Sequence, residues 1–252
     1  MIVAVHQPQY LPWLGYFDKI RQADIFCYLD NVQYKKNDWQ NRNRIKTSQG
    51  WQWITVPVHY QFPEKICEVK INPTVKWQKK QLQALITNYR RAPFFDNFFD
   101  IYEQIYSKNW EYLADLNIYF IERLKDALGL NQKPAIKSSQ LELREDPTDR
   151  LIDICKAVKA DTYMSGQDGV KYMDLERFKK SNIKVVIQDF KHPVYPQLFN
   201  DFQSHMSIVD LLFNCGTGSL AKIIDSNWVS DLLGARYKMT EGRRFKVKGA
   251  GL

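Results

Sequence analysis

The sequence has few cysteines and lacks the short motifs that mark common catalytic and nucleotide-binding folds. Cys27, Cys67, Cys155 and Cys215 are scattered, with no Cys-x-x-Cys pair and no Cys/His cluster. This spacing argues against a zinc site and against a disulfide framework, so we expect no metal and mostly buried, inert thiols. The G-x-G-x-x-G, Walker, G-x-S-x-G and H-E-x-x-H motifs are also absent. Several familiar enzyme classes are thereby excluded.

Long apolar runs are missing as well. No stretch approaches the roughly 20 apolar residues that a membrane-spanning helix needs. The opening residues, MIVAVHQPQYLPW, have neither a basic region nor a small-residue cleavage site typical of a secretory signal. We therefore expect a cytoplasmic protein without a membrane span.

The sequence has no concentrated basic motif, although its net charge is +8 over 252 residues. The lysines and arginines occur in small, separated groups, whereas a nucleic-acid-binding protein gathers them on one element. Nucleic acid is therefore an unfavoured partner. A small anionic ligand, such as a nucleotide-linked sugar, suits this distribution better, and a merely solvated basic surface explains it equally well.

The hydrophobic pattern predicts an α/β fold with a mostly parallel sheet built from βαβ units. The first unit comprises a strand at 2–5, a helix at 13–23 and a strand at 24–29. The second comprises a strand at 161–164, a helix at 170–180 and a strand at 183–188, and another helix at 147–157 precedes it. A further short helix begins at Ser207 and ends at Gly216.

An inserted β-hairpin and a helical subdomain separate these units. The hairpin is predicted at 42–45 and 51–58, with an additional alternating strand at 66–71. Helices at 77–89, 94–107 and 110–128 form a subdomain over roughly residues 74–130. We expect one domain over residues 1–225, followed by a partly disordered tail at 226–252.

Three polar groups follow predicted strands, where open parallel sheets bind their ligands: His6-Gln7, Asp30 and Ser165-Gly166-Gln167. His6 ends the first strand and is the candidate general base, since imidazole titrates near neutral pH. Asp30 follows the second strand and is the candidate partner of His6 or anchor of the substrate amine. Each also has a plain structural interpretation, because His6 can bond the loop backbone and Asp30 can stabilise a turn.

Further residues are candidates for substrate binding because of their chemistry and their place in loops. Tyr10, Trp13 and Trp39 offer flat rings for a base or sugar, although aromatic residues more often belong to a core. Arg42 offers a bidentate clamp for phosphate. Amide, hydroxyl and imidazole groups near strand ends or in loops complete the set: Gln7, Asn43, Ser165, Gly166, His192 and Gln197.

Several stretches, in order along the chain, resemble the WbqC-like protein family. The opening stretch is AVHQPQYLPWLGYFD at 4–18. The later stretches are Tyr28 with 30–33, WQNRN at 39–43, Val56-Pro57, NYRRAPF at 88–94, YMSG at 163–166, HPVYPQ at 192–197 and SIVDLLFN at 207–214. Tyr172, Tyr195 and Asn214 are associated with these matches and become further substrate-binding candidates. The resemblance covers roughly residues 1–225.

The resemblance implies a role in O-antigen or other surface-polysaccharide synthesis. The implied reaction is transfer of an acyl or aminoacyl (glycyl-like) group to the amine of a nucleotide-linked amino sugar. No cofactor is firmly implied, but an acyl-CoA or an aminoacyl carrier is an expected donor. The alternatives are a nucleotidylyltransferase-like enzyme and a non-catalytic nucleotide-sugar-binding protein of a polysaccharide-assembly complex. The sequence leaves the oligomeric state open.

Overall fold

A parallel five-stranded sheet forms the centre of the computed structural model, which describes residues 1–199, 201–224, 228–230, 236–238 and 246–247. The strands are β1 (Ile2–His6), β2 (Ile25–Tyr28), β7 (Ala135–Lys137), β8 (Thr162–Ser165) and β9 (Lys184–Asp189). Their order in the sheet is β7-β2-β1-β8-β9, and every neighbouring pair is parallel. The predicted α/β fold with a mostly parallel sheet is therefore confirmed.

This strand order determines where a ligand can bind. Counted along the chain, the five strands lie in the order 3-2-1-4-5, which is the doubly wound order 3-2-1-4-5-6 without its last strand. From β1 the chain first adds strands on one side, to β2 and β7, and then crosses over to add β8 and β9 on the other. The carboxyl ends of β1 and β8 therefore lie on either side of the topological switch point, where such sheets form a crevice.

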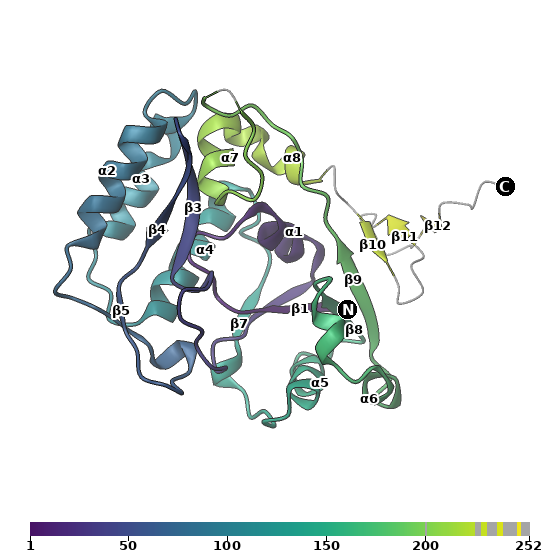
Figure 1. Cartoon of the computed structure of the whole chain (residues 1–252). Helices are drawn as coiled ribbons and strands as arrows, with labels where there is room; N and C mark the ends of the chain where they lie inside the picture. The colour runs from purple at the N-terminus through teal and green to yellow at the C-terminus, as the bar shows by residue number, and fades with distance from the viewer. Residues whose placement is uncertain (200, 225–227, 231–235, 239–245, 248–252) are drawn as a thin grey trace.

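Helices cover both faces of the sheet (Figure 1). One face packs against α5 (Pro147–Ala157) and α6 (Leu175–Lys180), through a cluster that includes Val3, Val5 and Phe178. The other face packs against α1 (Leu14–Gln22), α4 (Leu113–Ala127), α7 (Ile208–Cys215) and α8 (Ser219–Ile224). Both apolar faces of the central strands are thus buried, as a parallel sheet requires.

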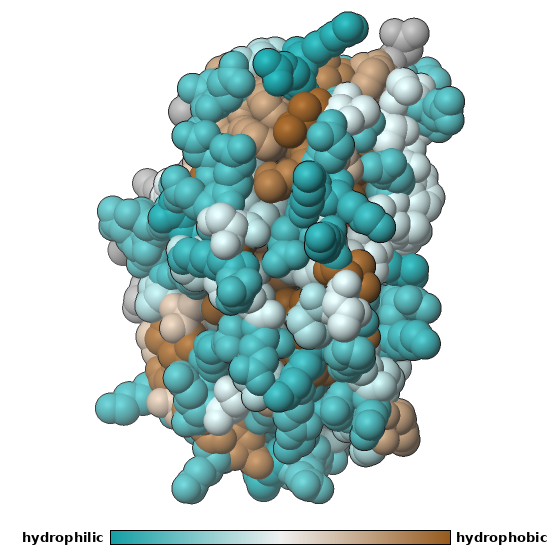
Figure 2. All heavy atoms as spheres, turned by 90° about the vertical axis from the view of Figure 1, so that its left-hand side faces the viewer, coloured by the Kyte–Doolittle hydropathy of each residue, from teal (hydrophilic) through white to brown (hydrophobic). Residues whose placement is uncertain are grey.

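The long connection between β2 and β7 contains the predicted hairpin and helical subdomain. The hairpin consists of β3 (Arg42–Thr47) and β4 (Gly50–Thr55). The short strands β5 (Val58–His59) and β6 (Lys70–Ile71) pair with each other, and α2 (Trp77–Tyr89) and α3 (Phe95–Tyr106) follow. On the side of the molecule that carries α2 and α3, hydrophilic residues predominate and apolar atoms show only in small patches (Figure 2). The aromatic residues of these helices mainly face the core.

Two predicted elements were wrong in part. The alternating stretch 66–71 is a 3₁₀ turn at Ile66–Glu68 followed by only two strand residues, because Ile66 and Cys67 donate their backbone N–H groups to the Val32 and Asp30 carbonyls instead of to a long strand. The predicted helix 170–180 is divided into a 3₁₀ turn at Gly169–Tyr172 and α6, since the Asp174 side chain caps a new helix.

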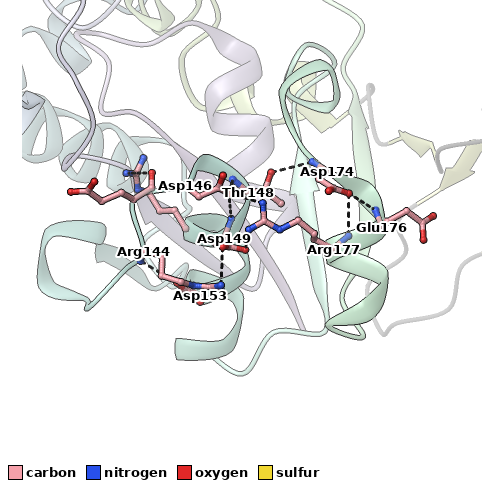
Figure 3. Close-up of polar contacts among 10 residues, drawn as sticks. Arg144, Asp146, Thr148, Asp149, Asp153, Asp174, Glu176 and Arg177 are labelled. Atoms are coloured by element: carbon pink, nitrogen blue, oxygen red, sulfur yellow. Dashed lines mark hydrogen bonds and ion pairs between the residues drawn. The ribbon is translucent and has the colours of Figure 1, made fainter.

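The helices α5 and α6 are joined by a network of arginine and aspartate side chains. Arg177 pairs with Asp146 and Asp149, while Arg144 pairs with Asp149 and Asp153 (Figure 3). All of these carboxylates are matched by a cation or by the N-terminal N–H groups of a helix. The network therefore holds two helices together and leaves no free charge for a ligand.

The predicted tail at 226–252 falls largely outside the described residues. The described part of it forms β10 (Trp228–Ser230), β11 (Arg236–Lys238) and β12 (Lys246–Val247). These strands continue the sheet beyond β9 in antiparallel pairs.

Candidate functional site

A cavity of about 510 Å³ opens at the topological switch point of the sheet. His6 and Gln7 contribute the end of β1, Ser165 and Gly166 the end of β8, and Gln188 the end of β9. The helix α1 and the segment after β9 close the other sides; their lining residues include Trp13, Gly15, Tyr16, Lys19, Phe190, His192 and His205. The cavity volume is in the range of small-molecule sites.

Lys19 is the most unusual side chain in this cavity. It is only 4% exposed, and among the described residues its ammonium forms no hydrogen bond or ion pair. Burial lowers the pKa of Lys19 to about 8, although the charge of Asp18 acts in the opposite direction. A buried cation without a partner destabilises a fold unless something else compensates for it. Lys19 is therefore placed to receive an anionic group from a ligand.

Asp18 precedes Lys19 but forms no ion pair with it in the described part of the chain, because other donors hold its carboxylate. It accepts hydrogen bonds from Arg21 at 2.8 Å, from Gln22 at 2.6 Å and from Gln188 at 2.7 Å. Burial raises its pKa, and these donors act in the opposite direction. Gln188 also donates to the carbonyl of Gly15 at 2.9 Å. Asp18 thus fixes β9 against α1 and leaves the adjacent lysine free.

His6 is neutral at physiological pH. Burial lowers its pKa to about 3, and the charge of Lys19 contributes to the same shift. Its Nδ1 lies 3.2 Å from the carbonyl oxygen of Gln7. Because a carbonyl only accepts, Nδ1 carries the proton in this contact and Nε2 keeps a lone pair. His6 can therefore accept a hydrogen bond from a ligand, but in the empty cavity it is a weak base.

Aromatic rings form the wall opposite the strand ends. Trp13 stacks against His205 at 5.5 Å and meets Phe190 edge-on at 5.2 Å. Both ring nitrogens of His192 are engaged: Nδ1 with the Pro193 carbonyl at 2.8 Å, and Nε2 as acceptor of the His205 backbone N–H at 3.1 Å. His192 therefore supports the wall through its ring face and does not offer a free nitrogen.

The structure brings six of the predicted site residues together in this cavity: His6, Gln7, Trp13, Ser165, Gly166 and His192. It also adds residues that sequence reasoning missed, chiefly Lys19, Gln188 and His205. Lys19 occupies an ordinary position in an amphipathic helix, so only its burial distinguishes it. The polar pair Asp18-Lys19 within the predicted helix was the one available signal.

Asp30 does not line the cavity. Its carboxylate accepts hydrogen bonds from the Ser138 hydroxyl at 3.0 Å and from the Ser139 hydroxyl at 2.7 Å and backbone N–H at 2.8 Å. These three donors occupy it fully, and the side chain is 2% exposed. Asp30 thus fixes the turn after β7 instead of orienting His6.

Two predicted binding residues hold the His6–Gln7 loop from behind. Asn43 is fully buried and donates to the carbonyls of Tyr10 at 3.2 Å and Leu11 at 2.8 Å. Tyr10 is also fully buried, with its hydroxyl bonded to Gln81 and Tyr106. Leu11 has a φ of +44°, a left-handed conformation that is rare for leucine and has to be held by its surroundings.

The remaining predicted residues lie elsewhere. Tyr195 and Gln197 donate to the buried carboxylate of Asp210, and the Asn214 side-chain oxygen accepts the Leu198 backbone N–H at 3.1 Å, so these three fasten the segment after β9 onto α7. Tyr172 is 78% exposed. Trp39 and Arg42 belong to an exposed group on the hairpin.

A second cavity, of about 700 Å³, lies between α2 and the end of α3. Lys76, Trp77, Tyr106 and Trp110 are among its lining residues, and none of the lining residues belongs to the parallel sheet. It is larger, but it lacks both strand ends and an unpartnered buried charge. The switch-point cavity is therefore the better candidate site.

Metal and thiol chemistry find little support in the described ranges of the chain. No group of three or more His, Cys, Asp or Glu side chains there is arranged to hold a metal ion. Burial raises the pKa of Cys27 and of Cys155 to about 12, so neither is a ready nucleophile.

None of the helices in the described part is long and apolar enough to cross a membrane.

The chain belongs to the WbqC-like protein family, which matches it over residues 7–222. Its relatives include the uncharacterized protein Rv1507c of Mycobacterium tuberculosis (strain ATCC 25618 / H37Rv). The two are 40% identical over 218 residues, which cover 85% of this chain and 94% of the relative. No solved structure matches the chain.

Proposed function

We propose that the protein is a transferase that moves an acyl or aminoacyl (glycyl-like) group to the amine of a nucleotide-linked amino sugar in surface-polysaccharide synthesis. The observation that carries the proposal is the unpartnered Lys19 ammonium beside neutral His6 in the switch-point cavity. A nucleotide-linked sugar supplies the missing anion through its diphosphate. Its amine supplies a donor for the free Nε2 of His6.

The reaction needs a neutral amine and a stabilised oxyanion. The sugar nitrogen attacks the carbonyl carbon of a thioester or ester donor, and a C–N bond forms while the C–S or C–O bond breaks. The proton lost by the nitrogen leaves with the thiol or alcohol of the donor. His6 Nε2 receives this proton first, and the Gln7 amide and the Ser165 loop lie nearby as candidate donors for the oxyanion.

Ligand binding itself improves His6 as a base. Burial is the main cause of its low pKa, and the charge of Lys19 is the second cause. A bound phosphate beside Lys19 cancels this second effect and raises the pKa of His6 toward the working range. The base is thus strengthened only when substrate is present.

The proposal places the enzyme in the cytoplasm, where its four free cysteines remain reduced. Its partners are the nucleotide-linked amino sugar and an acyl-CoA or aminoacyl carrier. The net charge of +8 attracts both of these anionic substrates.

The test is product formation with a panel of amino-sugar nucleotides and acyl donors, followed by mass spectrometry. We expect Lys19→Met and His6→Gln to lower kcat/KM by about a hundredfold or more. His59→Gln, on the exposed strand β5, is the matched control. Undiminished turnover in folded Lys19→Met and His6→Gln variants would refute this mechanism. Binding of a nucleotide sugar without turnover would indicate a binding protein, and nucleotide release from a nucleoside triphosphate would indicate a nucleotidylyltransferase.

A further inference from the structure

The β3–β4 hairpin carries an exposed array of alternating aromatic and cationic side chains. Trp39, Trp51 and Trp53 are 37%, 42% and 38% exposed, and Trp53 lies 5.4 Å from each of the other two. The Arg42 guanidinium lies 4.2 Å from the centre of the Trp53 ring. That of Arg44 lies 5.5 Å from Trp39 and 5.1 Å from Trp51. We call these five residues the Trp–Arg ladder.

The two cations of the ladder have no anionic partner in the described part of the chain. Neither Arg42 nor Arg44 forms an ion pair, and the Nε atom of each is buried without a hydrogen-bond acceptor. Arg44 makes one polar contact, from a terminal nitrogen to the His205 carbonyl at 3.3 Å. Stacking on indole rings holds the guanidinium groups flat and leaves their remaining N–H groups unmatched. The charge of the ladder is therefore complementary to an anion.

The ladder adjoins the switch-point cavity at two places. The His205 residue that Arg44 contacts stacks on Trp13 within the cavity wall. On the other side, Gln40 donates to the Gln7 side chain at 2.8 Å, and Gln7 lines the cavity. Arg44 is thus one contact away from the cavity wall, and the residue next to Trp39 contacts a lining residue.

We propose that the Trp–Arg ladder binds the nucleoside diphosphate part of a substrate whose reacting end enters the cavity. The base stacks on exposed indole surface, and the guanidinium groups bind phosphate oxygens, which their planar fork matches. The ladder is confined to one hairpin and the preceding Trp39, which suits a single nucleotide rather than a nucleic-acid strand. This inference rests on the proposed function for its substrate class, and the nucleotide belongs either to the sugar substrate or to a CoA donor.

The experiment measures binding of UDP and of CoA, separately, by calorimetry and by quenching of tryptophan fluorescence. We expect saturable binding of at least one of them, weakened about tenfold by Arg42→Gln and by Trp51→Leu. Arg42→Lys, which keeps the charge but loses the fork, should also weaken binding. The exposed Arg91 lies on the connection between α2 and α3. Arg91→Gln therefore removes the same charge away from the ladder and should change affinity by less than about twofold.

The results of these binding measurements distinguish binding at the ladder from binding in the cavity and from the transfer reaction. Lys19→Met should weaken UDP or CoA binding less than Arg42→Gln does, because the ladder holds the base and the adjoining phosphate, and Lys19 meets only the phosphate that reaches into the cavity. Loss of binding in Lys19→Met alone, or no binding of either probe, would overturn the inference. A single-stranded oligonucleotide binding a hundredfold more tightly than UDP would overturn it as well. If nucleotide binding depends on the ladder but the protein has no transferase activity, the binding site is supported and the proposed transfer reaction is refuted.

Discussion

The ammonium nitrogen of Lys19 lies 3.3 Å from the point that a Cβ atom would occupy on Gly166. An added methyl group there presses on the ammonium and has to displace it by a few tenths of an ångström. We therefore expect Gly166→Ala to weaken binding of the anionic substrate about tenfold while lowering stability by less than about 1 kcal/mol.

Substrate titration and thermal unfolding of the same Gly166→Ala preparation test this expectation. Gly218→Ala is the control, because a Cβ at Gly218 meets no atom within 4 Å. Equal affinity in Gly166→Ala and the unmodified protein would show that Lys19 does not hold the ligand.

Lys19 should lower the stability of the protein at neutral pH. Its pKa is about 8 in the folded state against 10.5 for an ordinary lysine. The unfolded chain therefore binds the proton more tightly, and stability rises with pH between about 8 and 10.5. We expect Lys19→Met to stabilise the protein by about 3 kcal/mol at pH 7, with the gain vanishing near pH 10.5.

Denaturant unfolding of Lys19→Met across this pH range provides the measurement. Lys80→Met, which alters an exposed lysine of α2, should change stability little at any pH. A loss of stability in Lys19→Met at pH 7 would mean that the ammonium has a partner in solution.

His6 should contribute to acid unfolding. Its pKa falls from 6.5 to about 3 on folding, so the unfolded state gains a proton first as the pH drops. Stability is then lost between about pH 6.5 and pH 3, with a slope of up to about 1.4 kcal/mol per pH unit from this residue. His6→Gln removes that slope, which urea unfolding at several pH values between 4 and 7 will reveal.

His192 and His205 also have pKa values lowered by burial, so part of the acid sensitivity should remain in the His6→Gln variant. His59→Gln, on the exposed strand β5, is the control for the removal of a histidine. An identical slope in wild type and His6→Gln would contradict the assignment of a neutral, buried His6.

Asn43 should be essential to the shape of the loop after β1. Asn43→Ala leaves the carbonyls of Tyr10 and Leu11 without their donor in a fully buried place. We expect a loss of about 2–4 kcal/mol in stability. KM should rise more than kcat falls, because the loop that carries Gln7 is released. Asn43→Asp, which keeps the shape but not the donor, should behave like the alanine variant.

Local sequence signals determined much of the secondary structure. Asp146 and Ser207 cap their helices through their own side chains, and Gly216 ends α7 with a φ of +59°. These contacts lie within a few residues along the chain, so the local sequence specifies them. Distant partners explain the failure at 66–71, where backbone contacts with the segment after β2 replace a strand, and at β7, for which no strand was predicted. The division of the predicted helix 170–180 has a local cause, the cap by Asp174.

The loop after the first strand lies at the carboxyl edge of the sheet, as predicted, because a strand ending in His6 is visible in the sequence. Which loop residues face the cavity was decided only by the tertiary structure. Three polar side chains of the kind that bind ligands instead form hydrogen bonds to distant residues inside the protein: Asn43, Tyr10 and Asp30.

The sequence by itself thus determined the α/β class and the position of the His6 loop at the carboxyl edge of the sheet. Tertiary structure alone decided the strand order, which places the end of β8 beside that of β1. It also decided the environment of Lys19, because desolvation and the lack of a counter-ion arise from packing between distant segments. No residue type or spacing distinguishes such a lysine from one that lies in water.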